Sequence, residues 1–529
     1  MKRLSKAKYT LVILLNVIIA IGYYVDNLNA NYSELSSDIQ NIIPVAQKFD
    51  NPNLFQEDLF LNDINNVKYY TPFYVQTLRF IAKFTNYNYV RAINVMGLIC
   101  HLLFGILWFF LLFKFVDNYW VCLLVSIIMR GIVWLPGLEI WGISDLWTMM
   151  PRTVYITLLP IPFLLLSYTF KKLLLASFFI GFIFNFHPIS GLGGILSFLA
   201  LITMLVYNFS SIRERFSLFK ILILVFAIVI GMLPFIVTYF SKTSSSVTYD
   251  IAAFNYAFNT RIPAYFTNAI LFLKQWLSFK TLFFIIPIIA YFLLTLREKY
   301  HHKKAKLLLG ITIILILIPT FSIPIEHSLN NALGMNLRMS FQLVRMQKVA
   351  IVPGFFALAF LLDYVFLKLK KPKIVPYIFS VYMVVLVFSE TKIFKQVPFF
   401  GDDISTSILP HNLSVFTSLR DHELYIDKMS KYIKLNTPTD AVICGSFIFR
   451  GATKRSVIFD GKGASMLIEG NPKQFIDWQK RIKKINSFKS INEVVSYLKR
   501  FNTDYFVTTS NVQQCELIHK EGKLKLYKL

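Results

Sequence analysis

The chain has 529 residues, of which 55% are hydrophobic and 16% are aromatic, and its formal net charge is +26. Apolar runs of about 18 residues or more recur, and each is long enough to cross a bilayer core of roughly 30 Å, which excludes an ordinary soluble domain. Many of the basic residues stand at the chain start or at the ends of apolar runs, so they predict membrane topology rather than binding to nucleic acid.

The hydropathy pattern predicts eleven membrane spans in a mainly α-helical, polytopic protein. The chain begins MKRLSKAK before its first apolar run, and no clear small-residue cleavage site follows, so we expect an uncleaved anchor. The predicted spans are 9–25, 92–115, 119–137, 153–170, 173–186, 190–208, 218–239, 281–296, 307–324, 345–367 and 374–391.

Clusters of Lys and Arg precede the first span and follow the even-numbered spans, for example at 297–306 and 368–373. The positive-inside rule places such clusters in the cytoplasm. We therefore expect a cytoplasmic N-terminus and an extracytoplasmic C-terminal region. Asn, Lys, Ile and Phe are abundant, which fits an AT-rich bacterial genome and hence a bacterial plasma membrane.

The first outer loop, residues 26–89, carries seven acidic and four basic residues in this otherwise basic chain. Its apolar residues recur at helical spacing in two short stretches, which predicts amphipathic helices lying along the membrane surface. Asp38 is the candidate general base, and a second interpretation of SSDIQ makes Ser36 or Asp38 the cap of a helix that begins at Ile39. Asp26, at the membrane boundary, is the second candidate, and an interfacial, solvated position is its alternative.

Asp58, in PNLFQEDLF, is a further candidate for contact with substrate, although ordering of the loop is the alternative role. Arg261 lies in the second outer loop, residues 240–280, and Arg345 lies at the outer start of the tenth span. A guanidinium binds two phosphate oxygens at once, so both arginines are candidate ligands of a lipid phosphate. Exposure to solvent is the alternative for Arg261, and snorkelling to the surface is the alternative for Arg345.

His187 stands in HPISGLGG, which interrupts an apolar stretch too long for one helix. The segment predicts a turn at the outer face whose glycines allow close helix packing. His187 is either a hydrogen-bonded turn residue or a ligand of the substrate.

From about residue 392 the pattern changes to alternating strands and helices, which predicts one small α/β domain over 392–529, after a membrane domain over 1–391. The predicted strands are 441–447, 455–461 and 503–510, and the predicted helices are 421–436, 471–485 and 491–501. The sequence contains no glycine-rich phosphate-binding motif, His-rich metal motif or nucleophile elbow. A Cys444–Cys515 disulfide is left open.

One span, an acidic loop, about ten further spans and an external α/β domain together resemble the C-type (GT-C) glycosyltransferase superfamily. The stretches that carry this resemblance are SSDIQNIIP (36–44), DNPNLFQEDLF (50–60), YYTPFY (69–74), MPRT (150–153), NFHPISGL (185–192), RIPAY (261–265) and FQLVRMQK (341–348). In many members two first-loop acids are separated by a single residue, and the nearest approach here is the adjacent pair Glu57 and Asp58.

The resemblance implies transfer of a sugar from a polyprenyl-phosphate-linked donor to a cell-envelope glycan or lipid acceptor at the outer membrane face. It implies that the first-loop carboxylate, Asp38 or else Asp26, is the base or a ligand of a divalent cation, the one cofactor that it suggests. Arg261 and Arg345 would then hold the lipid phosphate. The alternatives are an inactive relative that binds envelope lipid or polysaccharide as a scaffold, and a transporter or flippase.

Overall fold

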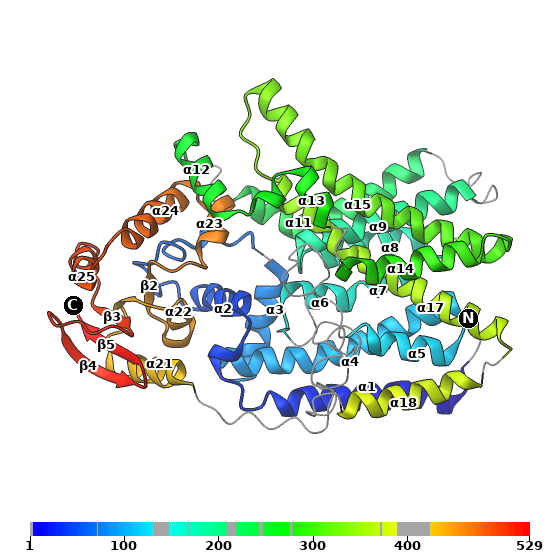
Figure 1. Cartoon of the computed structure of the whole chain (residues 1–529), viewed down its shortest axis with the longest axis horizontal. Coiled ribbons are helices and arrows are strands. Elements are labelled where there is room, and N and C mark those ends of the chain that lie inside the picture. The colour runs from blue at the N-terminus through cyan, green and yellow to red at the C-terminus, as the bar shows by residue number, and fades with distance from the viewer. Residues whose placement is uncertain are drawn as a thin grey trace. The chain divides into compact units, whose positions relative to one another are not determined.

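The computed structural model describes residues 4–70, 72–130, 148–167, 169–208, 218–242, 247–275, 279–370, 373–388 and 424–529. The described chain is mainly helical, with a small sheet near the C-terminus (Figure 1). It divides into two compact units. Unit 1 holds the described residues of 1–26, 95–233 and 263–418, and unit 2 holds those of 27–94, 234–262 and 419–529.

Unit 1 consists of apolar helices. Their bounds are α1 (Lys6–Asp26), α4 (Tyr89–Val116), α5 (Tyr119–Ile128), α6 (Pro151–Leu158), α7 (Pro160–Leu165), α8 (Phe170–Phe184), α9 (Pro188–Asn208), α11 (Leu218–Phe240), α13 (Ala269–Gln275), α14 (Phe279–Leu294), α15 (Lys299–Leu333), α16 (Ser340–Leu343), α17 (Ile351–Lys368) and α18 (Ile374–Phe388). Helices α4 and α11 each extend a few residues into unit 2. Two 3₁₀ helices, η5 (Ala264–Phe266) and η6 (Val344–Ala350), complete this unit.

Five helical segments are long and apolar enough to cross a membrane, so the chain is a membrane protein. They are Lys6–Asp26, Tyr89–Val116, Phe219–Phe240, Lys299–Leu333 and Ser340–Lys368. Each of the eleven predicted spans overlaps at least one described helix, but the helices in the other six spans are not among these five segments. The count of eleven and the outward placement of the C-terminal region stay predictions.

The predicted span 153–170 is divided in two by proline. Pro160 begins α7 directly after α6, because a proline nitrogen cannot donate the hydrogen bond that would continue the helix. The end of α7 is capped from α4, since the Lys114 ammonium donates to the carbonyl oxygens of Phe163, Leu164 and Leu166 at 3.0, 2.9 and 2.7 Å.

Unit 2 contains the C-terminal sheet. Its strands are β1 (Val442–Cys444), β2 (Ser456–Ile458), β3 (Tyr505–Thr508), β4 (Glu516–Glu521) and β5 (Leu524–Lys528), in the spatial order β2-β1-β3-β5-β4. Strand β1 pairs in parallel with β2 and β3, and Cys444 lies between Ile458 and Phe506. Strands β3, β5 and β4 pair antiparallel. The small C-terminal sheet agrees with the predicted strands, and the β4–β5 hairpin is an addition that the sequence pattern did not predict.

The helices of unit 2 come from all three of its chain segments. They are α2 (Ser37–Asp50), α3 (Pro72–Lys83), α12 (Ile251–Arg261), α21 (Tyr425–Asn436), α22 (Ile448–Thr453), α23 (Ala464–Gly470), α24 (Pro472–Asn486) and α25 (Ile491–Lys499), with 3₁₀ turns η1 (Tyr32–Glu34) and η2 (Ile64–Asn66). The first loop therefore does form two amphipathic helices, α2 and α3. In α2 every residue from Ile39 to Lys48 is buried, so its apolar face is covered by protein.

Hydrogen bonds join the first loop to the tail within unit 2. Gln47 donates from Nε2 to the Gly451 carbonyl at 2.9 Å, and the Tyr69 hydroxyl donates to the Met466 carbonyl at 2.8 Å. The two segments thus form one folded body, although the sequence pattern assigned them to separate domains. The boundary predicted between 391 and 392 lies outside the described residues.

Candidate functional site

Unit 2 contains a buried ion cluster that holds one turn of the tail. Arg450, on α22, has 1% of its side chain exposed. Its Nε lies 2.6 Å from Asp58 Oδ2, and its Nη2 lies 2.5 Å from Asp460 Oδ2. Asp460 Oδ1 also accepts from the backbone amides of Lys462 and Gly463, at 2.8 and 2.7 Å. We call residues Asp460–Ser465 the 460–465 turn.

The pKa values of the two carboxylates of this cluster are shifted in opposite directions. Burial raises the pKa of Asp58, against the opposing charge of Arg450. Burial also acts on Asp460, but the Arg450 charge and the two amide bonds outweigh it and hold the pKa of Asp460 below its usual range. Asp58 further accepts from the amides of Phe60, Leu61 and Val457, so its oxygens are engaged inside the fold. This geometry favours the ordering role among the two predicted for Asp58.

Asp38 meets the 460–465 turn from the first loop. Ser36 is the N-cap of α2, because its hydroxyl accepts from the Ile39 amide at 3.4 Å. The carboxylate of Asp38, in the first turn of the helix, instead lies 2.8 Å from the Lys462 ammonium through Oδ1. About a third of the Asp38 side chain is exposed, so it remains reachable from solvent.

Arg261 meets the same turn from a third segment of the chain. It is the last residue of α12, and its Nη2 donates to the Ser465 hydroxyl at 2.9 Å. Asp38 and Arg261, predicted separately from the sequence, therefore both contact the 460–465 turn, and Asp58 is linked to it through Arg450, which pairs with Asp460.

A polar cleft of about 450 Å³ lies between α12 and α24, beside this turn. It is lined by Tyr256, Thr260, Arg261, Trp478, Gln479, Ile482, Lys483, Asn486 and Ser487. Trp478 connects the cleft to the turn, since its indole N–H donates to the Asp460 carbonyl at 2.5 Å. The Lys483 ammonium donates to the Tyr256 hydroxyl at 3.2 Å and lies 4.9 Å from that ring.

The lining suits a ligand rich in hydroxyl groups that carries negative charge. Arg261 and Lys483 supply two cations, and Gln479 and Asn486 supply amides that both donate and accept. Tyr256 offers an aromatic face that is more than half exposed. Sugars present hydroxyl groups at their edges and C–H groups on their faces, and the cleft has side chains for both.

The other three predicted residues belong to unit 1. Asp26 is the last residue of α1 and is 8% exposed. The His187 ring accepts from the Ser190 amide through Nδ1 at 3.1 Å, at the start of α9, which is the geometry of the turn residue. The Arg345 guanidinium stacks on Phe266 and Phe341, at 4.7 and 5.7 Å from the ring centroids.

The donor groups do not fit a divalent cation at Asp38. Magnesium and calcium take six or more oxygen ligands, whereas Asp38 is paired with an ammonium. Within the described ranges, no three His, Cys, Asp or Glu side chains gather as a metal site would require. Glu57 is exposed while Asp58 is buried, so these neighbours do not form an acid pair.

Sequence reasoning did not identify Arg450, Asp460, Lys462 or the α24 residues of the cleft. The one local signal was the DGKG sequence at 460–463, whose glycines and Asp are typical of a tight turn. Both Cys444 and Cys515 are free thiols, which answers the question of a disulfide left open by the sequence.

No protein-family model matches the sequence, and no curated protein matches it. Among solved structures, the chain is similar to the oligosaccharyltransferase of Archaeoglobus fulgidus, crystallised with zinc and sulfate. The two share 12% sequence identity with a TM-score of 0.44, and the match covers 94% of this chain and 67% of that one. A likeness this distant carries no function across to this chain.

Proposed function

We propose that the chain is a membrane glycosyltransferase that moves a sugar from a polyprenyl-phosphate-linked donor to a cell-envelope acceptor. The observation that carries the proposal is the polar cleft of unit 2, whose Arg261 binds the same turn as Asp38. A candidate base and a candidate saccharide-binding surface thus contact the same turn within a membrane protein. Preorganised groups of this kind supply much of the rate enhancement in transfer reactions.

In this proposal the Asp38 carboxylate takes the proton of the acceptor hydroxyl. The acceptor oxygen then forms a bond to the anomeric carbon of the donor sugar, and the bond from that carbon to the phosphate oxygen breaks. The phosphate leaves with the electron pair, and a cation such as the Arg261 guanidinium stabilises its charge. Lys462 orients Asp38 in the resting protein and must yield one carboxylate oxygen to the acceptor.

The test is sugar transfer by the purified full chain in liposomes, supplied with a panel of polyprenyl-phosphate sugars. We expect Asp38→Asn to lower turnover about 100-fold, since general base catalysis contributes 10²–10⁴-fold. Glu57→Gln removes an exposed carboxylate from the same loop and is expected to leave turnover unchanged. Equal loss in both variants would contradict the role of Asp38.

The Lys462–Asp38 ion pair also favours a second candidate, a scaffold that binds envelope saccharide without catalysis. The two functions differ in one measurement. A scaffold binds an anionic oligosaccharide at the cleft, with affinity reduced by Arg261→Gln and not by Arg500→Gln, yet shows no turnover with any donor. Turnover that depends on Asp38 excludes it.

A further inference from the structure

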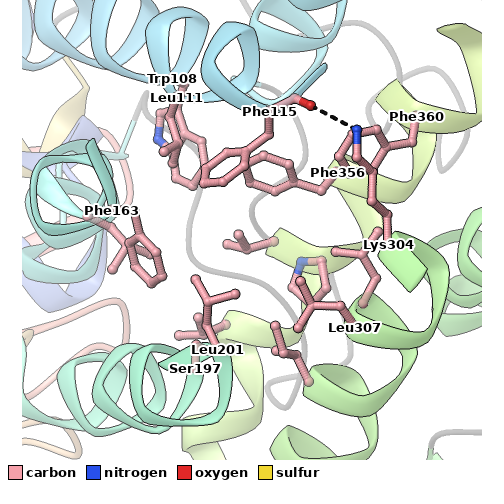
Figure 2. A pocket seen from close by; sticks show the side chains of 16 residues that line it. Trp108, Leu111, Phe115, Phe163, Ser197, Leu201, Lys304, Leu307, Phe356 and Phe360 are labelled. Atoms are coloured by element: carbon pink, nitrogen blue, oxygen red, sulfur yellow. Dashed lines mark hydrogen bonds between the residues drawn. The ribbon is translucent and has the colours of Figure 1, made fainter. Parts of the chain in front are cut away.

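Unit 1 contains a second cavity, of about 130 Å³, that is partly open and lies among its apolar helices (Figure 2). Four helices supply most of its wall: α4, α9, α15 and α17, with further residues from the α6–α7 segment and η6. The lining residues are Trp108, Leu111, Phe115, Leu159, Phe163, Ser197, Leu201, Lys304, Leu307, Leu308, Ile311, Val349, Val352, Pro353, Phe356 and Phe360.

The wall behaves chemically as hydrocarbon. Its two neutral polar groups are already engaged, because the Trp108 indole N–H donates to the Ile156 carbonyl at 3.0 Å and the Ser197 hydroxyl donates to the Gly193 carbonyl at 2.8 Å. An engineered apolar cavity of about 150 Å³ stays dry and binds benzene. A cavity of this kind therefore accepts a short length of hydrocarbon chain rather than water.

Helical spacing makes the cavity a slot with one charged end. On α15 the lining residues Lys304, Leu307, Leu308 and Ile311 follow the i, i+3, i+4, i+7 pattern of a single helix face. Lys304 is the N-terminal member of that face, where the basic start of α15 gives way to its apolar part. The slot thus passes from a cation into an apolar interior.

The Lys304 ammonium has weak partners where it lies. It donates to the Phe115 carbonyl at 3.3 Å, which Figure 2 marks, and it lies 4.5 and 4.8 Å from the centres of the Tyr300 and Phe360 rings. No carboxylate of the described residues lies within 4.0 Å of it. Asp363 is close enough to sense its charge, but Asp363 Oδ1 accepts from Asn118 at 2.8 Å. A cation beside hydrocarbon is stabilised by an anionic partner.

We propose that this slot binds one chain of an anionic membrane phospholipid, with Lys304 paired to the phosphate of its head group. The apolar wall holds the first part of the acyl chain, and the charge selects the head group. The neighbouring Lys114 cannot serve, because its three N–H groups already cap α7.

A phospholipid is favoured over the polyprenyl phosphate of the proposed reaction. Lys304 belongs to the basic segment 297–306, which the positive-inside rule predicts to be cytoplasmic, whereas transfer is predicted at the outer face. The inference does not depend on the proposed function, since a scaffold or a transporter would hold the same lipid.

The test is native mass spectrometry of the purified full chain in detergent, with equal amounts of phosphatidylglycerol or phosphatidylcholine added. We expect the wild type to retain phosphatidylglycerol about fivefold more than phosphatidylcholine, the effect of roughly one lysine near an anionic lipid surface. Lys304→Gln is expected to abolish this preference and Lys304→Arg to keep it. The matched control Lys306→Gln removes an exposed charge two residues away, outside the slot, and is expected to keep it.

Filling the slot provides a second, independent readout. Val352→Phe places a ring in the cavity and is expected to reduce retention of both lipids, whereas Val225→Phe, at an exposed position of α11, is expected to retain them. Thermal unfolding of each variant shows whether it is folded. If Val352→Phe does not fold, the lipid preference of Lys304→Gln is the test of the proposal. Equal retention of the two lipids by the wild type, or full preference in Lys304→Gln, overturns the proposal. Displacement of phosphatidylglycerol by an equal amount of polyprenyl phosphate also overturns it and assigns the slot to the donor.

Discussion

The buried guanidinium of Arg450 is stabilised by carboxylate partners. Two carboxylates face it, Asp58 and Asp460, and together they hold the pKa of Arg450 above its usual range despite the cost of burial. The Phe60 ring lies against its guanidinium at 5.2 Å. Removing Asp58 leaves Arg450 paired with Asp460 but takes away the acceptor of Arg450 Nε and of three backbone amides, and each buried donor left unpaired costs about 1–3 kcal/mol.

Asp58→Ala is therefore expected to destabilise unit 2 by about 3–5 kcal/mol. The measurement is thermal unfolding of the full chain in detergent, compared with Glu57→Gln, which is expected to stay within about 0.5 kcal/mol of wild type. A loss below about 1 kcal/mol for Asp58→Ala would show that Arg450 finds another partner.

The cysteines give a prediction about reactivity. Burial in β1 raises the pKa of Cys444 to about 12, so at pH 8 only about one molecule in 10⁴ carries its thiolate, which is the reactive form. Cys515 is partly exposed. Treatment of the native protein with a maleimide at pH 8, followed by peptide mapping, is expected to label Cys515 within minutes and Cys444 only after unfolding. Because the pKa of Cys444 lies above pH 8, its thiolate fraction, and with it the rate of labelling, rises as the pH is raised. Rapid native labelling of Cys444 would contradict its burial.

Helix α24 carries the cleft and also holds the turn beneath it. Trp478 donates to the Asp460 carbonyl, and its ring stacks with Phe475 at an interplanar angle of 9°. Trp478→Phe keeps a ring but removes the donor, which leaves a buried carbonyl unpaired at a cost of about 1–3 kcal/mol. We expect lower stability and weaker saccharide binding, measured by thermal unfolding and isothermal titration. Tyr497→Phe, on α25, removes a hydroxyl for which the described residues provide no hydrogen bond, and it serves as the control.

Helices and strands could be predicted where a local pattern of hydropathy or alternation marks them. Hydropathy placed a helix in every predicted span, and alternation placed β1, β2 and β3. From the sequence, either Ser36 or Asp38 was a candidate for the N-cap of α2. In the structure Ser36 is the cap, and the Asp38 carboxylate pairs with Lys462 instead. The contacts of Asp38, Asp58 and Arg261 with the tail were not predictable, because their partners stand far away in the chain and no local pattern encodes that pairing.

At the scale of the whole molecule, the distribution of charge predicts the topology. The positive-inside rule predicts that the segment 297–306 is cytoplasmic and that the C-terminal region is extracytoplasmic. In a background without the four native cysteines, Lys523→Cys is expected to react with an impermeant maleimide on intact cells, since Lys523 is an exposed residue of the β4–β5 turn. Lys306→Cys is expected to react only after the cells are permeabilised. The reverse pattern would contradict the predicted orientation and with it the proposed outward reaction.

The three-segment origin of unit 2 has a consequence for biosynthesis. Asp58 and Arg450 are separated by 392 residues, which a ribosome needs roughly 20–80 s to add at 5–20 residues per second. Throughout that interval the first loop has been made while the tail that it packs against has not. Its apolar residues are therefore exposed to proteases and chaperones, and the loop can misfold. The tail produced by itself would in turn keep Asp460 but lack Asp58, the acceptor of Arg450 Nε. Folding of this body is thus a late event, timed by the completion of the chain rather than by the emergence of its first part.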